Sequence, residues 1–193
     1  MPEPPFPVVL ASASPRRKEL LAKLVAEFEV VPADVDEAAV EEPDPWVAAQ
    51  RTAREKALAV ARLRPDALVI AGDTVVALSQ GDGWRQLGKP TDEQDARAML
   101  RDLSGRTHTV VTGVCLHWPG GMSAFTESSK VTFREISDDE IAAYVATGSP
   151  LDKAGAYGLQ DESQSFITKV EGPIDNVIGL PLEKLEDALS SIA

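Results

Sequence analysis

The sequence predicts an α/β fold in which helices flank a mixed sheet. Strand and helix patterns alternate through residue 71, as in parallel units joined by helices. Two long β-rich runs, residues 107–118 and 122–134, then follow each other across Pro119-Gly120-Gly121, which indicates an antiparallel pair. Because neither a repeat nor a linker divides the chain, we expect one domain over residues 1–193.

The first part of the chain predicts strands that alternate with helices. Continuous apolar runs indicate buried strands, and leucine or alanine at helical spacing indicates helices. The expected strands cover residues 6–11, 28–31 and 67–71, and the expected helices cover residues 15–27 and 46–63. A loop rich in acid and proline, residues 32–45, precedes the second helix.

The second part predicts a hairpin and capped helices. Gly81-Asp82-Gly83 is typical of a turn between strands at residues 75–78 and 84–87. Thr91 with Gln94, and Ser137 with Glu140, are capping-box patterns that predict helix starts. The remaining expected elements are helix ends near residues 103 and 148, a strand near residues 166–170 and a closing helix from about residue 182.

The composition limits the classes of partner. A formal net charge of −12 argues against a nucleic-acid or anionic-membrane partner, because both would repel the chain. A small anionic ligand responds to local charge more than to distant charge, so it remains compatible. The single cysteine, Cys115, fits a reducing compartment. With no signal peptide and no stretch long enough to span a bilayer, we expect a soluble cytoplasmic protein.

The segment after the first strand combines hydroxyls, a proline and two arginines. Ser14 suits the N-cap of a helix, and Pro15 suits its first position. The free N–H groups of that turn, the hydroxyls of Ser12 and Ser14 and the guanidiniums of Arg16 and Arg17 would then point to one place. Because arginine pairs well with phosphate oxygens, the segment predicts a polyphosphate site. An ordinary capped helix with basic surface residues is the alternative.

Asp73 lies inside an apolar sequence, between residues 68–71 and 75–78. A carboxylate there is costly unless it is paired, hydrogen-bonded or bound to a metal. Ligands also collect at strand ends in α/β sheets, where we expect Gly72-Asp73-Thr74 to lie. Asp73 is therefore the candidate general base or metal ligand. The alternative is a turn aspartate that is hydrogen-bonded to the backbone.

Lys56 falls on the inward stripe of the second predicted helix, together with Ala49, Ala53, Val60 and Leu63. Its ammonium group either extends past the edge of the core or reaches into a cavity to meet an anion. From spacing alone, the first outcome is favoured.

Two further lysines lie beside glycines, Lys89 in Gly88-Lys89-Pro90 and Lys153 in residues 152–158. Glycine allows a ligand to approach the backbone closely, although neither segment is a Walker A loop. Five cations would together surround a triphosphate: Arg16, Arg17, Lys56, Lys89 and Lys153. The carboxylates of Asp36, Glu37 and Asp73 would hold the divalent cation, Mg²⁺ or Mn²⁺, that usually accompanies one.

Other chemistries are not predicted. His108 and His117 are the only histidines and have no acid at ligand spacing, which argues against a zinc site or a histidine-based triad. Cys115 is expected in the core. The tryptophans are scattered along the chain, which suits packing better than a stacking platform for bases.

These segments together resemble the Maf family of nucleoside triphosphate pyrophosphatases, from about residue 10 to residue 185. The matching blocks are residues 12–17, Asp36-Glu37, Arg54-Glu55-Lys56-Ala57, Gly72-Asp73-Thr74, Gly88-Lys89-Pro90, and residues 104–108, 151–160 and 176–181. Several blocks in this order are far more specific than any one of them. The resemblance implies an α/β fold with a deep cleft between two lobes, and often a homodimer.

The resemblance also implies hydrolysis of a nucleoside triphosphate to the monophosphate and pyrophosphate with a divalent metal. Asp73 matches the family's proton acceptor, and we expect Lys56 and Lys89 to be catalytic beside it. Glu37 and Asp73 are the expected metal ligands. The expected substrate-binding residues are Ser12, Ser14, Arg16, Arg17, Thr74, Lys153 and Gln160.

The resemblance extends to the choice of nucleotide, to which residues matching Arg17, Thr74 and Gln160 are tied. The Asp73-Thr74 pair and the run of residues 153–160 look like the branch that acts on dTTP and UTP. The branch that acts on 7-methyl-GTP usually has Asp-Gln at the first place and is the alternative enzyme. A module that binds triphosphates without turnover is the alternative of another class.

The chain departs from the family pattern at two places, both expected near the nucleoside pocket. Asp161, Glu162 and Ser163 follow Gln160 where glycines are common. Pro173-Ile174 stands where a tyrosine is usual.

Overall fold

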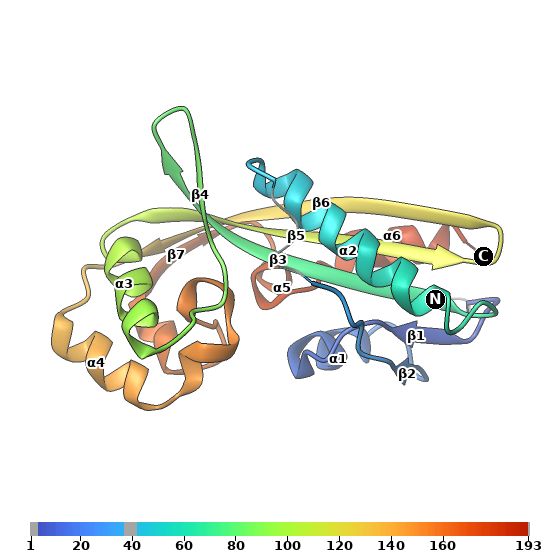
Figure 1. The fold of residues 1–193 in the computed structure, drawn as a ribbon, viewed down its shortest axis with the longest axis horizontal. Coiled ribbons are helices and arrows are strands. Elements are labelled where there is room, and N and C mark those ends of the chain that lie inside the picture. The colour runs from blue at the N-terminus through green and yellow to red at the C-terminus, as the bar shows by residue number, and fades with distance from the viewer. Residues whose placement is uncertain (1–3, 37–41, 193) are drawn as a thin grey trace.

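The centre of the molecule is a seven-stranded mixed sheet, described by a computed structural model that covers residues 4–36 and 42–192. Its strands are β1 (Val8–Leu10), β2 (Glu29–Val30), β3 (Leu68–Gln80), β4 (Gly83–Leu87), β5 (Thr107–Trp118), β6 (Gly121–Phe133) and β7 (Ile167–Glu171). They are ordered β2-β1-β3-β5-β6-β7, and β4 pairs with β3 (Figure 1). The pairs of β1 with β2 and β3 are parallel and the others are antiparallel, which confirms the expected mixed sheet.

Three long strands, β3, β5 and β6, run the length of the sheet (Figure 1). β5 pairs with every residue of β3 from 69 to 77, so that Asp73 lies opposite Gly113. β3 is therefore one continuous strand, and the expectation that Gly72-Asp73-Thr74 ends a strand was wrong. The extended backbone tolerates Asp73 because its neighbours on β5 supply the backbone hydrogen bonds.

The other edge of β3 is paired only at its two ends. β1 pairs with it as far as Ile70, and β4 pairs with it from Val76 onward. Between them, among the residues that the structure covers, residues 72–75 pair with no strand on this edge. The chain leaves β1 here to enter the first helix, so Asp73 and Thr74 are left beside an opening in the sheet.

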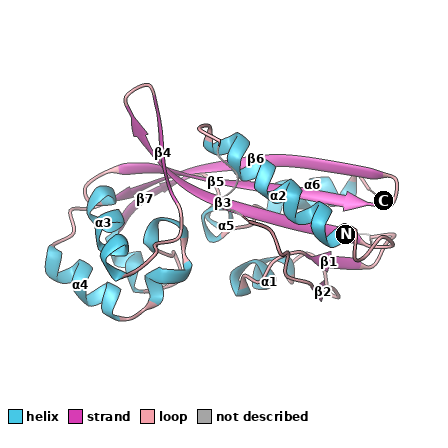
Figure 2. Cartoon of the chain, viewed as in Figure 1, coloured by secondary structure: helices cyan, strands magenta, loops and turns pink. Residues whose placement is uncertain are grey.

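Helices cover both faces of the sheet (Figure 2). They are α1 (Pro15–Leu21), α2 (Pro45–Ala61), α3 (Glu93–Leu103), α4 (Asp138–Ala146), α5 (Ile174–Ile178) and α6 (Leu182–Ser190), with the 3₁₀ turns η2 (Ser149–Asp152), η3 (Ala154–Ala156) and η4 (Glu162–Phe166). α2 crosses one face, while α1 and the pair α3–α4 lie at opposite ends of the other. None of the helices in the described ranges is long and apolar enough to span a bilayer.

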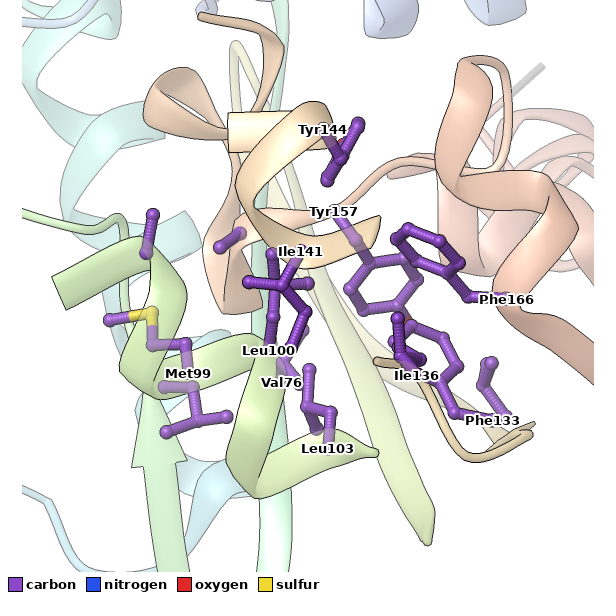
Figure 3. Packing of buried hydrophobic residues seen from close by; sticks show 14 of the residues in the cluster. Val76, Met99, Leu100, Leu103, Phe133, Ile136, Ile141, Tyr144, Tyr157 and Phe166 are labelled. Atoms are coloured by element: carbon purple, nitrogen blue, oxygen red, sulfur yellow. The ribbon is translucent and has the colours of Figure 1, made fainter. Parts of the chain in front are cut away.

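Three hydrophobic clusters divide the interior. Alanines of α2 pack on Ala71 and Cys115, and Cys115 is fully buried as expected. On the opposite face, α1 and α6 pack on Ile70 at one end of the sheet. α3 and α4 pack on Val76 at the other end, where Figure 3 shows their side chains beside a group of aromatic rings. Each cluster on this face belongs to one lobe, and β3 and β5 run through both.

Two predicted helices end earlier than expected. α1 stops at Leu21, because a turn in which Lys23 N–H donates to Leu20 O (3.1 Å) brings Leu24 and Val25 onto the same cluster. α2 stops at Ala61, and Leu63 is 69% exposed rather than on the inward stripe.

The two predicted helix caps differ in outcome. Ser137 and Glu140 form the expected capping box at the start of α4. Before α3, however, Asp92 is the N-cap, because its carboxylate accepts from the N–H of Asp95 at 2.8 Å. The Thr91 hydroxyl instead donates to the Asp95 carboxylate (3.3 Å), and the box with Gln94 was wrong. Aspartate is at least as good an N-cap as threonine, which explains the shift.

Candidate active site

A cavity of about 660 Å³ opens beside the unpaired edge of β3, between α1 and the turns η2 and η3. Ten of the candidate residues line it: Ser12, Ser14, Arg16, Arg17, Lys56, Asp73, Thr74, Lys89, Lys153 and Gln160. The five cations among them come from four separate segments of the chain. Asp36 is not among the lining residues, and Glu37 lies outside the described residues. The roles of all these residues stay predictions.

The start of α1 is built as a capped helix that faces the cavity. The Ser14 hydroxyl accepts from the N–H of Arg17 (3.4 Å), and the Ser12 hydroxyl accepts from the N–H of Ser14 (3.2 Å). Pro15 occupies the first helical position. The helix cap and the line of hydroxyls and arginines along the cavity therefore occur together, rather than as alternatives.

Arg17 joins three parts of the fold. Its Nε donates to the carbonyl oxygen of Gly179 (2.9 Å), Nη2 to the hydroxyl of Thr74 (3.0 Å) and Nη1 to the hydroxyl of Ser12 (3.3 Å). Gly72 allows this approach, because a Cβ there would lie 3.2 Å from Arg17 Nε. The guanidinium is thus fixed in position beside β3.

Lys56 reaches into the cavity and pairs with Asp73. Its Nζ lies 2.8 Å from Asp73 Oδ1, and the two side chains are only 8% and 15% exposed. The expectation that Lys56 extends past the core edge was therefore wrong, because the opening beside β3 brings the carboxylate within reach of α2. A largely buried pair of opposite charges depends on both partners, since removing one leaves the other uncompensated. Asp73 is also not a turn aspartate bound to the backbone.

Asp152 connects cations from the two sides of the cavity. Its Oδ2 lies 3.2 Å from Arg16 Nη1, and its Oδ1 accepts from Lys153 Nζ at 2.7 Å. Partial burial raises the pKa of Asp152, but the hydrogen bond and charge of Lys153 and the charge of Arg16 outweigh it and hold that pKa below its usual range. Two predicted phosphate ligands are therefore engaged by one carboxylate.

Asp161 fixes the loop that carries Lys153 and Gln160. Its carboxylate accepts from Tyr144 Oη and from Ser149 Oγ, both at 2.9 Å, and from the backbone and side chain of Ser163. Lys153 Nζ lies 3.5 Å away. Burial raises the pKa of Asp161, but these hydrogen bonds lower it further than burial raises it. The departure from the family pattern thus makes contacts behind the cavity, and neither it nor Pro173-Ile174 contributes lining residues.

Tyr157 lines the cavity from the aromatic cluster of Figure 3. Its hydroxyl lies 2.7 Å from Nε2 of His108, which is only 2% exposed. Burial lowers the pKa of His108 to about 3 and raises that of Tyr157. His108 is therefore a neutral core residue behind Tyr157.

The carboxylates of the cavity suit a metal that arrives with a phosphate ligand. No group of three or more histidine, cysteine or acidic side chains in the described part of the chain is arranged to hold a metal ion. Mg²⁺ in phosphate-binding sites takes only one or two carboxylates, and phosphate oxygens and water complete its shell. Asp73 on the cavity wall fits that donor set.

Sequence reasoning missed several contacts that shape the site. No role was assigned to Asp152, Asp161 or Thr112, although each carried a signal. Asp152 adjoins a lysine, and Asp161 stands where the family commonly has glycine. Thr112 places a hydroxyl in a buried valine-rich strand, and a buried polar group requires a partner.

The comparisons with known proteins identify the family of the chain. The model of the family described as Maf-like protein matches residues 7–192. A dTTP/UTP pyrophosphatase of Koribacter versatilis is 49% identical over 178 residues, which are 92% of this chain and 90% of that protein. A dTTP/UTP pyrophosphatase of Aquifex aeolicus is 44% identical over 185 residues, which are 96% of this chain and 95% of that protein.

Solved structures agree on the fold. The Ham1 protein of Staphylococcus aureus superposes with a TM-score of 0.54 at 18% identity, over 96% of this chain and 99% of that one. A HAM1 protein of Coxiella burnetii gives 0.51 at 16% identity, over 96% and 99% of the two chains. Identities this low concern the fold alone, whereas the match over residues 7–192 and the identities of 44% and 49% show that this chain belongs to the Maf family.

Proposed function

We propose that this protein hydrolyses dTTP and UTP to the nucleoside monophosphate and pyrophosphate. The observation that carries the proposal is the cavity that five cations line, in which one of them, Lys56, is paired with Asp73. Three phosphate groups bring a charge that such a cluster can neutralise. The names of the relatives from Koribacter versatilis and Aquifex aeolicus support the choice of dTTP and UTP.

Asp73 is the proposed general base. Its Oδ1 is held by Lys56, so the carboxylate has a second oxygen with which to orient a water and accept its proton. That water attacks the α-phosphorus, the bond to the bridging oxygen breaks, and pyrophosphate leaves. Phosphoryl transfer depends mainly on positioning and charge neutralisation, which Arg16, Lys89 and Lys153 supply from the cavity wall.

A divalent cation, Mg²⁺ or Mn²⁺, is part of the proposal. Asp73 would hold it, together with Glu37 and the phosphate oxygens of the substrate. When bound, such an ion neutralises charge on the triphosphate. The support comes from the chemistry of Asp73 and from the resemblance of residues 36–37 and 72–74 to the family blocks.

Arg17, Thr74 and Gln160 are the proposed residues for nucleotide choice. Gln160 is exposed and lines the cavity, and its amide can both donate to and accept from the edge of a base. Ser12 and Ser14 are the proposed hydroxyl ligands of the phosphates, beside Arg16 and the N-terminal turn of α1.

The proposal also includes a cytoplasmic location and assembly as a homodimer. A cytoplasmic location agrees with the single buried cysteine, which needs no oxidising environment. The net charge of −12 supports a small-molecule substrate rather than a nucleic acid. The family resemblance supports a homodimer.

Product analysis tests the activity directly. The purified protein is incubated with Mg²⁺ or Mn²⁺ and a panel of canonical and modified triphosphates that includes dTTP, UTP, CTP and 7-methyl-GTP. We expect monophosphate and pyrophosphate from dTTP and UTP. Preferential turnover of 7-methyl-GTP would favour the other family branch, binding without products would favour a sensing module, and release of diphosphate and phosphate would contradict the cleavage site.

The general base is tested with Asp73→Asn. Removing the proton acceptor should lower kcat for dTTP by about 10²- to 10⁴-fold. Asp82→Asn, in the exposed turn between β3 and β4, is the matched control and should keep its activity. Near-normal turnover by a folded Asp73→Asn variant would remove Asp73 from this role.

A further inference from the structure

Four hydrogen bonds and the backbone of α5 form a closed ring that connects four elements beside the cavity. Arg17 of α1 donates to the Thr74 hydroxyl of β3, which lies 3.0 Å from the Thr112 hydroxyl of β5. Thr112 Oγ1 donates to the backbone oxygen of Asn176 in α5 at 2.8 Å. Gly179, which caps α5, accepts from Arg17 Nε and closes the ring.

The direction of each bond in the ring is fixed. A threonine hydroxyl has one hydrogen and two lone pairs. The single hydrogen of the Thr112 hydroxyl is donated to the carbonyl of Asn176. In the hydrogen bond between the two threonines, Thr74 must therefore be the donor. Arginine can only donate, so Thr74 accepts from Arg17. Thr74 therefore has no hydrogen left for a ligand, and retains one lone pair.

The ring rests on a rigid base. Thr112 and Asn176 are fully buried. The Asn176 side-chain amide donates to the Val110 carbonyl (3.1 Å) and to Ser129 Oγ (3.0 Å). Ser129 in turn donates to the Pro173 carbonyl at 2.8 Å, so its oxygen is the acceptor for Asn176. These bonds to β5 and β6 hold Asn176, and with it the backbone carbonyl that accepts the hydrogen of Thr112.

We propose that Thr112 is a positioning residue that sets the nucleotide preference through Thr74, an inference that rests on the proposed function. By taking the hydrogen of Thr74, Thr112 presents Thr74 to the cavity as an acceptor only. The matching group on a substrate is a donor. Among pyrimidine bases, uracil and thymine carry N3–H, whereas cytosine carries an acceptor at N3. The ring thereby favours UTP and dTTP over CTP and dCTP.

Thr112→Val removes the hydroxyl and keeps the shape of the side chain. Thr74 then regains a hydrogen that it can offer to a ligand, so an acceptor base becomes tolerated. The ratio of kcat/KM for UTP to that for CTP, measured by competition in one reaction, should fall about tenfold. Thr112→Ser restores the hydroxyl and should return the ratio to the wild-type value.

The competition ratio separates positioning from stability, because it does not depend on the fraction of enzyme that is folded. Thr132→Val is the matched control, since it removes a threonine pair of the same kind between β5 and β6 (Thr107–Thr132, 2.8 Å) that does not line the cavity. Its ratio should equal that of the wild type.

The possible results distinguish failure of the inference from failure of the proposed function. A wild-type ratio in Thr112→Val, whatever its thermal stability, overturns the inference and leaves the proposed function intact. A fall that Thr112→Ser does not reverse also overturns it. A wild-type protein that hydrolyses neither UTP nor dTTP overturns the proposed function and the inference together.

Discussion

His108 is a neutral imidazole inside the lobe that α3 and α4 cover. It contacts the rings of Phe133 and Tyr157 edge to face, and its Nδ1 is buried without a partner in the described part of the chain. Charging this ring inside the cluster would cost desolvation energy, which explains its pKa of about 3. Protonation of the His108 imidazole at low pH should therefore destabilise the lobe that carries Tyr157.

The pKa of His108 predicts how stability changes with pH. The folded value lies below the ordinary 6.5, so the unfolded chain binds the proton more readily. The contribution of neutral His108 to the free energy of unfolding is complete above pH 6.5. It is lost as the pH falls toward 3, at about 1 kcal/mol per pH unit. In denaturant titrations between pH 6.5 and 4, His108→Phe should show a shallower fall than the wild type. A His108 ring that titrates near pH 6.5 by NMR would contradict the prediction.

Lys56 shows how far sequence reasoning reaches for one residue. Helical spacing placed Lys56 on the inward stripe correctly, and it is 6% exposed. The same spacing could not give the destination of its ammonium group. That depends on Asp73 and on the unpaired edge of β3, which are set by pairing between distant segments.

β3 shows the same limit for an element. Its composition suggested a break at Gly72-Asp73-Thr74, because a local pattern carries no information about what a strand pairs with. Continuous pairing with β5 keeps the backbone extended through these residues. The hairpin after β3, the long β5–β6 pair and the capping box of α4 were predictable, because each depends on residues adjacent in the sequence.

Gly113 allows α2 to pack directly on β5. A Cβ at this position would lie 2.3 Å from the backbone carbon and oxygen of Ala49, a distance that real contacts do not reach. The helix backbone cannot yield as a flexible side chain would. This close approach brings Lys56, further along α2, near enough to meet Asp73.

Gly113→Ala should therefore displace α2. We expect a loss of at least about 2 kcal/mol in the free energy of unfolding, because α2 must move away from the sheet. Chemical denaturation measures the loss. Gly83→Ala in β4, where a Cβ would meet only one atom at 3.9 Å, is the matched control. Equal stability of the two variants would show that α2 accommodates the methyl group.

Across the whole molecule, the net charge is negative, whereas the fold gathers positive side chains at one cavity. The net charge of −12 would repel an anionic substrate, yet five cations from distant segments face one cavity. Such convergence follows from the fold and not from any local pattern. The resemblance to the family predicted this convergence, because the matching blocks, although separate in the sequence, belong to residues that lie together in the fold.

The two lobes share their strands. β3 and β5 contribute side chains to the cluster under α1 and α6 and to the cluster under α3 and α4. Neither lobe has a sheet of its own in the parts of the chain that are described. One domain over residues 1–193 stays a prediction.

Asp152 places an anion beside the cations that line the cavity. It pairs with Arg16 from one lobe and with Lys153 from the other, so under the proposed function the phosphates of a nucleotide would compete with this carboxylate for both cations. A triphosphate brings several negative groups to that competition. Under the proposed function, the monophosphate that remains after pyrophosphate leaves has fewer negative groups, so we expect Asp152 to compete with it and to favour its release.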